Sequence, residues 1–258
     1  MGTALDVAAA TRAEAGKLAE VLESAPPGFW GKACCGDWTV DQVVGHLGIV
    51  PSTIQGLFQD TLDGIEVEPF DATSEDFQEA QLDLIGEGEP ADRVEAVLAA
   101  YGAFADFASS VSSDRRLREP AWTPEGVMPL EIGLCIPLNE LIVHGWDIRL
   151  LLGGPTEPDA GSAELLVPYL ARALGAFIAP GTGGRPLALD IGGQSWTLEA
   201  GPEGVQVEGG VSAEASLKAD PATFLLFVWG RITLDEARAR GMDVNREAVR
   251  LLNALRPF

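Results

Sequence analysis

The apolar positions of the first 180 residues recur at the spacing of amphipathic helices. In the stretch 4–24, Leu18, Val21 and Leu22 follow this spacing, and Pro26-Pro27-Gly28 ends the segment. The same pattern returns three more times before the glycine-rich segment near residue 180. Further helices are therefore predicted over about 91–113, 129–152 and 160–178.

Another predicted helix begins near Thr39, in the stretch DWTVDQVVGHL. Thr39 is a suitable N-cap, and Gln42, three residues later, completes a capping box. Pro51 lies within what should be the continuation of this helix. Because proline lacks a backbone N–H, we expect it to disturb the helix there.

Beyond the stretch PGTGGRP at 180–186, the pattern changes to short segments in which apolar and polar residues partly alternate. Glycine pairs and GPEG separate these segments, so we predict antiparallel strands joined by hairpins. Asp220-Pro221 then starts a predicted helix, and two further helices follow at TLDEARARG and NREAVRLLNAL. The strand segments read LALDI, SWTLEA, VQVEG and AEASLKA.

These patterns predict an α plus α+β fold with two domains. Residues 1–180 form a helical bundle, and residues 181–258 form a small α+β domain. Residues 33–92 contain no Lys or Arg and fourteen Asp or Glu, most of them after residue 60. The segment 60–92 is therefore predicted to be a long, acidic and exposed connection, of the kind that often forms the lid or rim of a site.

The net charge of −22 argues against two classes of partner. Nucleic-acid phosphates require clustered Lys and Arg, and anionic membrane surfaces attract basic segments. We therefore expect neither nucleic acid nor a membrane as partner. The first 20 residues lack a signal-peptide pattern, which predicts a cytoplasmic protein. Cys34, Cys35 and Cys135 are interpreted as reduced thiols, buried or half-buried.

The two histidines of the chain, His46 and His144, both lie in apolar predicted helices. Glu140 precedes His144 by four residues, so the two share a helix face, and Asp147 follows three residues later. Side chains from facing helices of a bundle can meet in its core. Two imidazoles and one carboxylate are a normal ligand set for Zn²⁺, with a fourth position open to water or substrate. The pattern leaves a second interpretation open, in which Glu140 and His144 form a buried pair without a metal.

Two stretches of the chain resemble one protein family. CCGDWTVDQVVGHL (34–47) is similar to the signature C-x-G-W-T-V … H-L, and NELIVHGWDI (139–148) is similar to E-x-x-V-H-x-W-D. Both signatures are typical of the mycothiol-dependent maleylpyruvate isomerase family of the DinB-like superfamily. Members of it have an N-terminal four-helix bundle that holds a divalent metal, usually zinc, through two His and one Glu. The resemblance assigns these ligands to His46, Glu140 and His144.

The resemblance also implies roles for residues around the metal. Asp147 and Arg231 are expected to take part in catalysis, Asp147 as a pocket residue and Arg231 as a guanidinium that holds a substrate carboxylate. Trp38, Trp146 and Arg149 are the expected cofactor-binding residues. The residue patterns alone leave open a core-filling role for both tryptophans and a helix-terminal charge role for Arg231.

The second half resembles the sterol-carrier-like domain that many members carry, in ASLKADPATFLLFVWGRITLDEA and GMDVNREAVRLLNAL. The leading hypothesis is therefore a metal-dependent, mycothiol-using isomerase or thiol S-transferase that acts on a small electrophile, which carries a carboxylate if Arg231 has the implied role. One alternative is a biosynthetic tailoring enzyme that needs no thiol, which the unusual Pro51 favours. The other is a non-enzymatic binder of lipids or small molecules. We expect a monomer or a weak homodimer.

Overall fold

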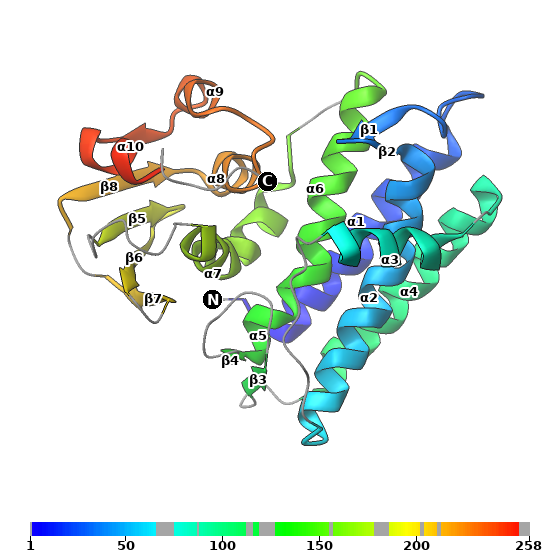
Figure 1. Cartoon of the computed structure of the whole chain (residues 1–258), viewed down its shortest axis with the longest axis horizontal. Helices are drawn as coiled ribbons and strands as arrows, with labels where there is room; N and C mark the ends of the chain where they lie inside the picture. The colour runs from blue at the N-terminus through cyan, green and yellow to red at the C-terminus, as the bar shows by residue number, and fades with distance from the viewer. Residues whose placement is uncertain are drawn as a thin grey trace. The chain divides into compact units, whose positions relative to one another are not determined.

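A computed structural model describes residues 2–65, 75–86, 88–111, 116–118, 127–154, 157–177, 186–201, 204–210 and 213–252. Its contacts divide the chain into two compact units (Figure 1). The first comprises residues 1–118 and 128–158, and the second comprises residues 119–127 and 159–258. A helical region is thus followed by a sheet with helices, which confirms the predicted fold class.

Four long helices of the described residues form the body of the first unit. Helices α1 and α2 each pack against both α4 and α6. Their apolar faces meet in a common core that includes Leu18, Val44, Val97 and Leu141, and burial of these side chains is the main force that holds the helices together. The helices are α1 (Ala4–Glu23), α2 (Val40–Leu62), α4 (Pro90–Ser110) and α6 (Cys135–Leu151).

Helix α2 begins where the sequence predicted it. The Thr39 hydroxyl accepts a hydrogen bond from the Gln42 backbone N–H at 3.3 Å, and the Gln42 side chain accepts one from the Thr39 N–H at 2.8 Å. Pro51 lies inside α2, which nevertheless continues to Leu62. Because its start is fixed by the capping box, α2 holds its first two turns, including His46, in a defined position.

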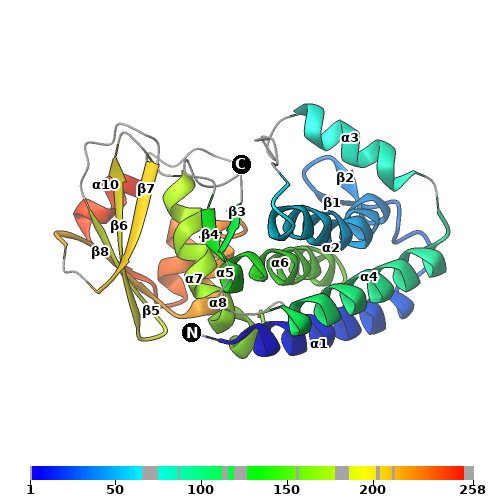
Figure 2. The same ribbon diagram turned by 90° about the horizontal axis from the view of Figure 1, so that it is seen from below.

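A short helix, α3 (Glu75–Ile85), lies in the segment that the sequence predicted only as an exposed connection. It packs against α2. Figure 2 shows it on the side of the bundle where α2 lies, away from α1. Helix α3 therefore covers one face of α2, next to the helix turns that carry His46.

The single helix predicted over 129–152 is divided in two. Helix α5 (Leu130–Gly133) ends before Leu134, and α6 begins at Cys135 with Pro137 in its first turn, where a missing N–H breaks no helical hydrogen bond. Two short antiparallel strands, β1 (Ala33–Cys35) and β2 (Trp38–Thr39), precede α2. Another two-stranded sheet joins β3 (Arg116–Arg118) and β4 (Val127–Pro129).

The second unit contains a five-stranded sheet with the strand order β7-β6-β5-β8-β9. The neighbours β5, β6 and β7 are antiparallel, as predicted. Strand β8 instead runs parallel to β5, so the prediction of an antiparallel hairpin was wrong for it. Alternation of apolar residues sets which face is buried but does not select the partner strand. The strands are β5 (Leu187–Ile191), β6 (Gln194–Gly201), β7 (Gly204–Gly209), β8 (Ala215–Ala219) and β9 (Asp243–Val244).

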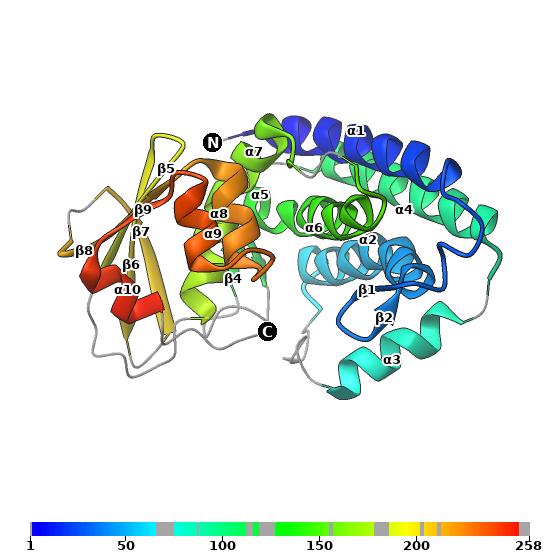
Figure 3. The ribbon, with the colours of Figure 1, turned by 90° about the horizontal axis from the view of Figure 1, so that it is seen from above.

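Helix α7 (Ala160–Phe177) belongs to the second unit, although the sequence placed it in the first domain. It packs against β6, β7 and α8 (Pro221–Val228). Figure 3 shows α7 and α8 on the same side of the sheet. The division between units thus falls near residue 158, ahead of the predicted boundary at 180, because the apolar side of α7 covers the sheet.

Helices α9 (Leu234–Ala239) and α10 (Arg246–Leu252) complete the described part of the second unit, and α10 packs against β8. A capping box at Thr233 and Glu236 fixes the start of α9. Among the helices that are described in either unit, none combines the length and the apolar character that a membrane span requires.

Candidate metal centre

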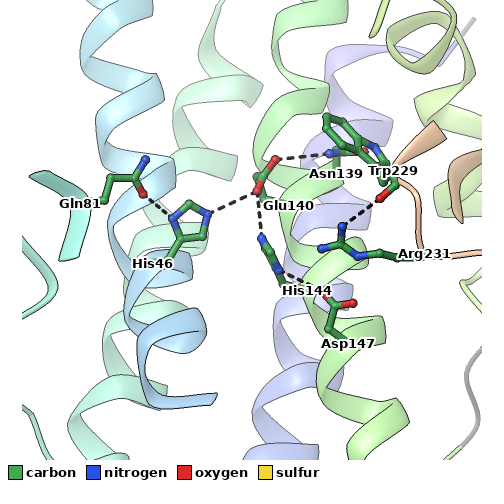
Figure 4. A network of polar contacts seen from close by, with 8 residues as sticks. All are labelled: His46, Gln81, Asn139, Glu140, His144, Asp147, Trp229 and Arg231. Carbon is green, nitrogen blue, oxygen red and sulfur yellow. Dashed lines mark hydrogen bonds and ion pairs between the residues drawn. The ribbon is translucent and has the colours of Figure 1, made fainter. Parts of the chain in front are cut away.

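Helices α2 and α6 bring His46, Glu140 and His144 together, as Figure 4 shows. The Nε2 atoms of both histidines lie 3.4 Å from the same oxygen, Oε2 of Glu140. The two imidazole rings are nearly perpendicular, at 85°, with 5.3 Å between their centroids. One donor atom from each of the three side chains lies within 4.8 Å of the other two. The set therefore surrounds one small volume between the helices.

The outer nitrogen of each imidazole faces an oxygen atom. Nδ1 of His46 lies 2.5 Å from Oε1 of Gln81, and Nδ1 of His144 lies 3.1 Å from Oδ2 of Asp147. An oxygen acceptor at Nδ1 holds the ring proton there, and the lone pair of a neutral ring is then on Nε2. Both Nε2 lone pairs consequently point toward Glu140.

The carboxylate of Glu140 is also held from its other side. The Asn139 side-chain amide donates to Oε1 of Glu140 at 3.4 Å, and Asn139 is almost completely buried. This contact leaves Oε2 directed at the two imidazoles. All three ligand candidates are thus oriented by a hydrogen-bonding neighbour.

The geometry of this donor set fits a divalent cation. Zinc bonds to imidazole nitrogen and carboxylate oxygen are about 2.0–2.2 Å long, so neighbouring ligands of a tetrahedral site lie about 3.3–3.5 Å apart. The observed 3.4 Å between Oε2 of Glu140 and each Nε2 atom equals that separation. With both rings neutral, three electron-rich atoms face one another, and a cation between them replaces that repulsion by attraction.

Without a metal, the same contacts shift the protonation of the pair. Burial disfavours the Glu140 carboxylate, but hydrogen bonds and positive charge from His144 and His46 outweigh burial and lower its pKa far below the ordinary value. Burial likewise opposes protonation of His144, yet its hydrogen bonds to Asp147, Cys35 and Glu140 raise its pKa well above 6.5. The metal-free centre therefore favours an ion pair between His144 and Glu140.

The β1–β2 hairpin contributes one residue to each histidine. Cys35 and Trp38 are register partners across the hairpin. Cys35 forms a hydrogen bond with His144 and joins it in a second group of donor atoms with Asp147. The ring of Trp38 contacts that of His46 edge to face, at 5.4 Å between centroids. Trp38 therefore lies against one candidate ligand, and its cofactor-binding role stays a prediction.

The other residues that the sequence selected lie in various surroundings. Trp146 is buried in α6. The guanidinium of Arg149 lies beside Gly145, where a Cβ atom would be 3.2 Å from Nη1, and the carboxylate of Glu14 in α1 acts on it. Burial lowers the pKa of Arg149, and the charge of Glu14 opposes this. Arg149 is thus placed next to α1, and its cofactor-binding role stays a prediction.

Arg231 belongs to the second unit, where its Nη1 donates to the Trp229 carbonyl at 2.9 Å. The Trp229 ring stacks on that of Tyr169, at 6.5 Å between centroids. These contacts fix the chain just after α8 and support the structural role that the residue pattern left open. The role of Arg231 in substrate binding also stays a prediction.

Sequence reasoning missed Gln81, Asn139 and Cys35 as neighbours of the ligands. Gln81 lies in the acidic segment that was predicted as a connection, where the apolar pair Leu82 and Ile85 at helical spacing was the available signal. Cys35 was interpreted as a half-buried thiol, which it is, and its contact with His144 depends on a hairpin that the sequence did not predict. Asn139 carried no signal beyond its place next to Glu140.

Tyr101, in α4, tests whether a buried hydroxyl in the bundle core has a hydrogen-bond partner. It is fully buried, and its hydroxyl has no hydrogen-bond partner among the described residues. Burial, and next the charge of Glu140, raise the pKa of Tyr101. Because an unpaired buried hydroxyl costs about 1–3 kcal/mol, Tyr101→Phe should leave the free energy of unfolding unchanged or raise it by about 1 kcal/mol. Urea denaturation measures this, and a loss above about 1 kcal/mol would show that the hydroxyl is paired.

Comparisons with known proteins agree with this arrangement. The family model described as the mycothiol maleylpyruvate isomerase N-terminal domain matches residues 8–149. Two crystal structures of the mycothiol-dependent maleylpyruvate isomerase, one of them of a point mutant, superpose with a TM-score of 0.57 at 16% sequence identity. Each superposition covers 90% of this chain and 93% of the chain in the crystal structure.

At this identity the two crystal structures show a shared fold alone. A search of curated proteins gives no match. The family model, however, spans more than half of the 258 residues and includes His46, Glu140 and His144. The chain therefore belongs to the mycothiol maleylpyruvate isomerase N-terminal domain family.

Proposed function

We propose that this protein is a zinc-dependent enzyme that uses a low-molecular-weight thiol of the mycothiol type to transform a small electrophile. The observation that carries the proposal is the convergence of two Nε2 atoms on Oε2 of Glu140, each 3.4 Å away. Two nitrogen ligands and one carboxylate favour a borderline ion such as Zn²⁺ over Mg²⁺ or Ca²⁺, which prefer oxygen ligands. Three protein ligands leave one position for an exogenous molecule, as in catalytic zinc sites.

A divalent ion held there lowers the pKa of a bound thiol and polarises a carbonyl group. The chain supplies the environment for this chemistry. Gln81 and Asp147 keep the ring protons on Nδ1 of His46 and His144, so that both Nε2 atoms remain ligands. The burial of His46 and Asp147, 9% and 7% exposed, limits water around the ligands.

The reaction that we propose begins with addition of the thiol sulfur to an electrophilic carbon, such as that of a conjugated double bond. The carbon–sulfur bond forms as the π electron pair of the double bond moves onto the conjugated carbonyl oxygen, and the carbon–carbon bond that has become single can rotate. Loss of the thiol then restores the double bond in the other geometry, which is cis–trans isomerisation. If the thiol stays, the proton that it lost is returned to the carbon next to the carbonyl, or the leaving group departs from an alkylating substrate. The product is then a thioether and the enzyme is an S-transferase. Neither outcome needs an oxidant or a reductant.

The test combines metal analysis with turnover. We expect purified protein to bind about one zinc per chain, and turnover of maleylpyruvate or of an alkylating bimane to require both mycothiol and zinc. His46→Ala and His144→Ala should lose zinc and turnover together. Protein that binds no zinc when it is supplied would overturn the proposal. Turnover that persists without thiol would instead support the thiol-independent tailoring enzyme.

A further inference from the structure

Helix α3 reaches the candidate metal centre through one described side chain, Gln81. Its amide oxygen lies 2.5 Å from Nδ1 of His46, on the side of the ring opposite Glu140 (Figure 4). The helix is otherwise on the outside of the bundle, where it packs against α2. The position of α3 relative to α2 therefore determines whether Gln81 can reach the ring.

The two helices approach each other closely at Gly45, directly before His46. A Cβ atom on Gly45 would overlap Cγ2 of Ile85 and would lie 3.3 Å from Nη1 of Arg93. Ile85 ends α3 four residues after Gln81 and is 7% exposed. Its branched side chain has little freedom to move away. The absence of a side chain at position 45 thus permits α3 to lie against the turn of α2 that carries His46.

Arg93 of α4 stabilises the contact between α3 and α2 through hydrogen bonds to both helices. Its Nη1 and Nη2 donate to the backbone carbonyls of Ile85 and Gly86 at 2.9 and 2.8 Å, which satisfies the last carbonyl of α3 and that of the next residue. Its Nε and Nη2 also donate to the two carboxylate oxygens of Asp41, in the first turn of α2, at 3.1 and 3.2 Å. Arg93 is 9% exposed, whereas the Asp41 side chain is 32% exposed, so this bidentate contact is partly buried.

We propose that α3 is a positioning element of the metal centre. The absence of a side chain at Gly45 lets α3 lie against α2, and the hydrogen bonds of Arg93 hold it there. In this position Gln81 keeps the ring proton of His46 on Nδ1, which leaves Nε2 available to the metal. Gln81 acts through His46 and is not itself a ligand. The inference rests on the proposed metal function and adds to it the residues that set the tautomer and the orientation of the His46 ring.

The choice of an amide at position 81 fits the charges of the centre. Glu140 and Asp147 already contribute two carboxylates, and together they balance one divalent cation. A neutral acceptor at His46 keeps that balance while it still orients the ring. Gln81 thus performs at His46 the task that Asp147 performs at His144, without adding a third negative charge.

The first experiment compares two substitutions of Gln81 in the full chain. Gln81→Met keeps the length of the side chain but has no oxygen acceptor, so its zinc affinity should fall about 10–100-fold. Gln81→Glu keeps the acceptor, so although it adds a third negative charge it should bind zinc more tightly than Gln81→Met. Competition with a chromophoric chelator measures the affinity, and the absorption bands of the Co²⁺-loaded variants report the ligand geometry. Equal affinity of Gln81→Met and wild type, or no recovery in Gln81→Glu, would overturn the proposal.

The second experiment moves α3 without touching Gln81. Gly45→Ala forces Ile85 away and should lower zinc affinity at least about tenfold, because Gln81 then loses His46. Gly48→Ala is the matched control, since its Cβ would meet Ala96 at an ordinary 3.6 Å and it carries the same gain in helix propensity. Adding Ile85→Ala to Gly45→Ala removes the overlapping atoms and should restore part of the affinity.

The thermal unfolding of each metal-free variant is recorded beside its zinc affinity. A variant that loses affinity at unchanged metal-free stability shows the positioning role, whereas Gly45→Ala with full affinity contradicts it. Zinc bound by wild type but unaffected by every α3 variant overturns the role of α3 alone. A wild type that binds no zinc overturns the metal function and this inference together.

Discussion

Glu140→Gln is expected to abolish stable zinc binding. The substitution keeps the shape of the side chain but replaces the oxygen on which both Nε2 atoms converge at 3.4 Å by a neutral group. Loss of an outer partner alone costs about 10–100-fold in metal affinity, so loss of a charged ligand should exceed about 100-fold. Zinc per chain, measured by plasma mass spectrometry after gel filtration against a weak chelator, should fall from about one to near zero.

A change in overall charge is separated from the loss of a ligand by Glu95→Gln. Glu95 is exposed on α4, and its substitution removes one negative charge at a distance from the centre. This control should retain its zinc. If Glu140→Gln also retained zinc with wild-type affinity, the zinc would be bound without Glu140. Glu140 and His144 would then form the metal-free pair that the sequence left open, and the proposed metal function would fail.

The stability of the metal-free protein should fall as the pH rises above 6.5, opposite to the metal-loaded protein. His144 has a pKa well above 6.5 in the folded state, so its stabilising contribution is complete below 6.5 and is lost as the pH rises through the folded value. The pKa of Glu140 is lowered from 4.5, so its contribution is complete above 4.5 and is lost as the pH falls toward the folded value. The metal-free protein is therefore expected to be most stable between pH 4.5 and pH 6.5, the ordinary pKa values of the two groups.

With zinc present, the stability above pH 6.5 should rise with pH instead of falling, because zinc competes with protons for the same nitrogen atoms. Denaturation in urea at pH 6 and pH 8, with chelator and with excess zinc, measures both slopes. Each unit by which the pKa of His144 exceeds its ordinary value corresponds to about 1.4 kcal/mol of lost stability in the metal-free form. A metal-free protein whose stability is unchanged or higher at pH 8 than at pH 6 would contradict the ion pair. His144→Asn, which lacks the titrating ring, should abolish the slope.

Local signals predicted the helices that carry the ligand candidates. Thr39 and Gln42 form the predicted capping box, and the spacing of Glu140 and His144 places both on the same face of α6. The sequence also predicted that His46 would meet them, which required a second helix in the right register. These features depend on residues that are close in the chain or on a resemblance that covers two separate motifs.

The features that the sequence did not reveal depend on distant contacts. The acidic composition of 60–92 concealed α3, whose last turn is held by Arg93 and whose Ile85 packs against Gly45. Strand β8 selects β5 as a parallel partner, and α7 covers the sheet, although neither choice is encoded in local periodicity. The guanidinium of Arg149 lies beside Gly145 and under the influence of the Glu14 charge from α1, a long-range contact that local periodicity does not encode.

The distance along the chain between α2 and α6, which carry the ligand candidates, determines at what stage of folding the centre can form. His46 and Glu140 are 94 positions apart, and the helices α3, α4 and α5 lie between them. Bringing such distant segments together is among the slow steps of folding, since the entropy of closing a long loop is lost before any contact compensates it. An ion therefore has no complete set of ligands to gather during early collapse. A metal ion that binds here would join a bundle that has already closed, and would then slow its reopening rather than guide its assembly.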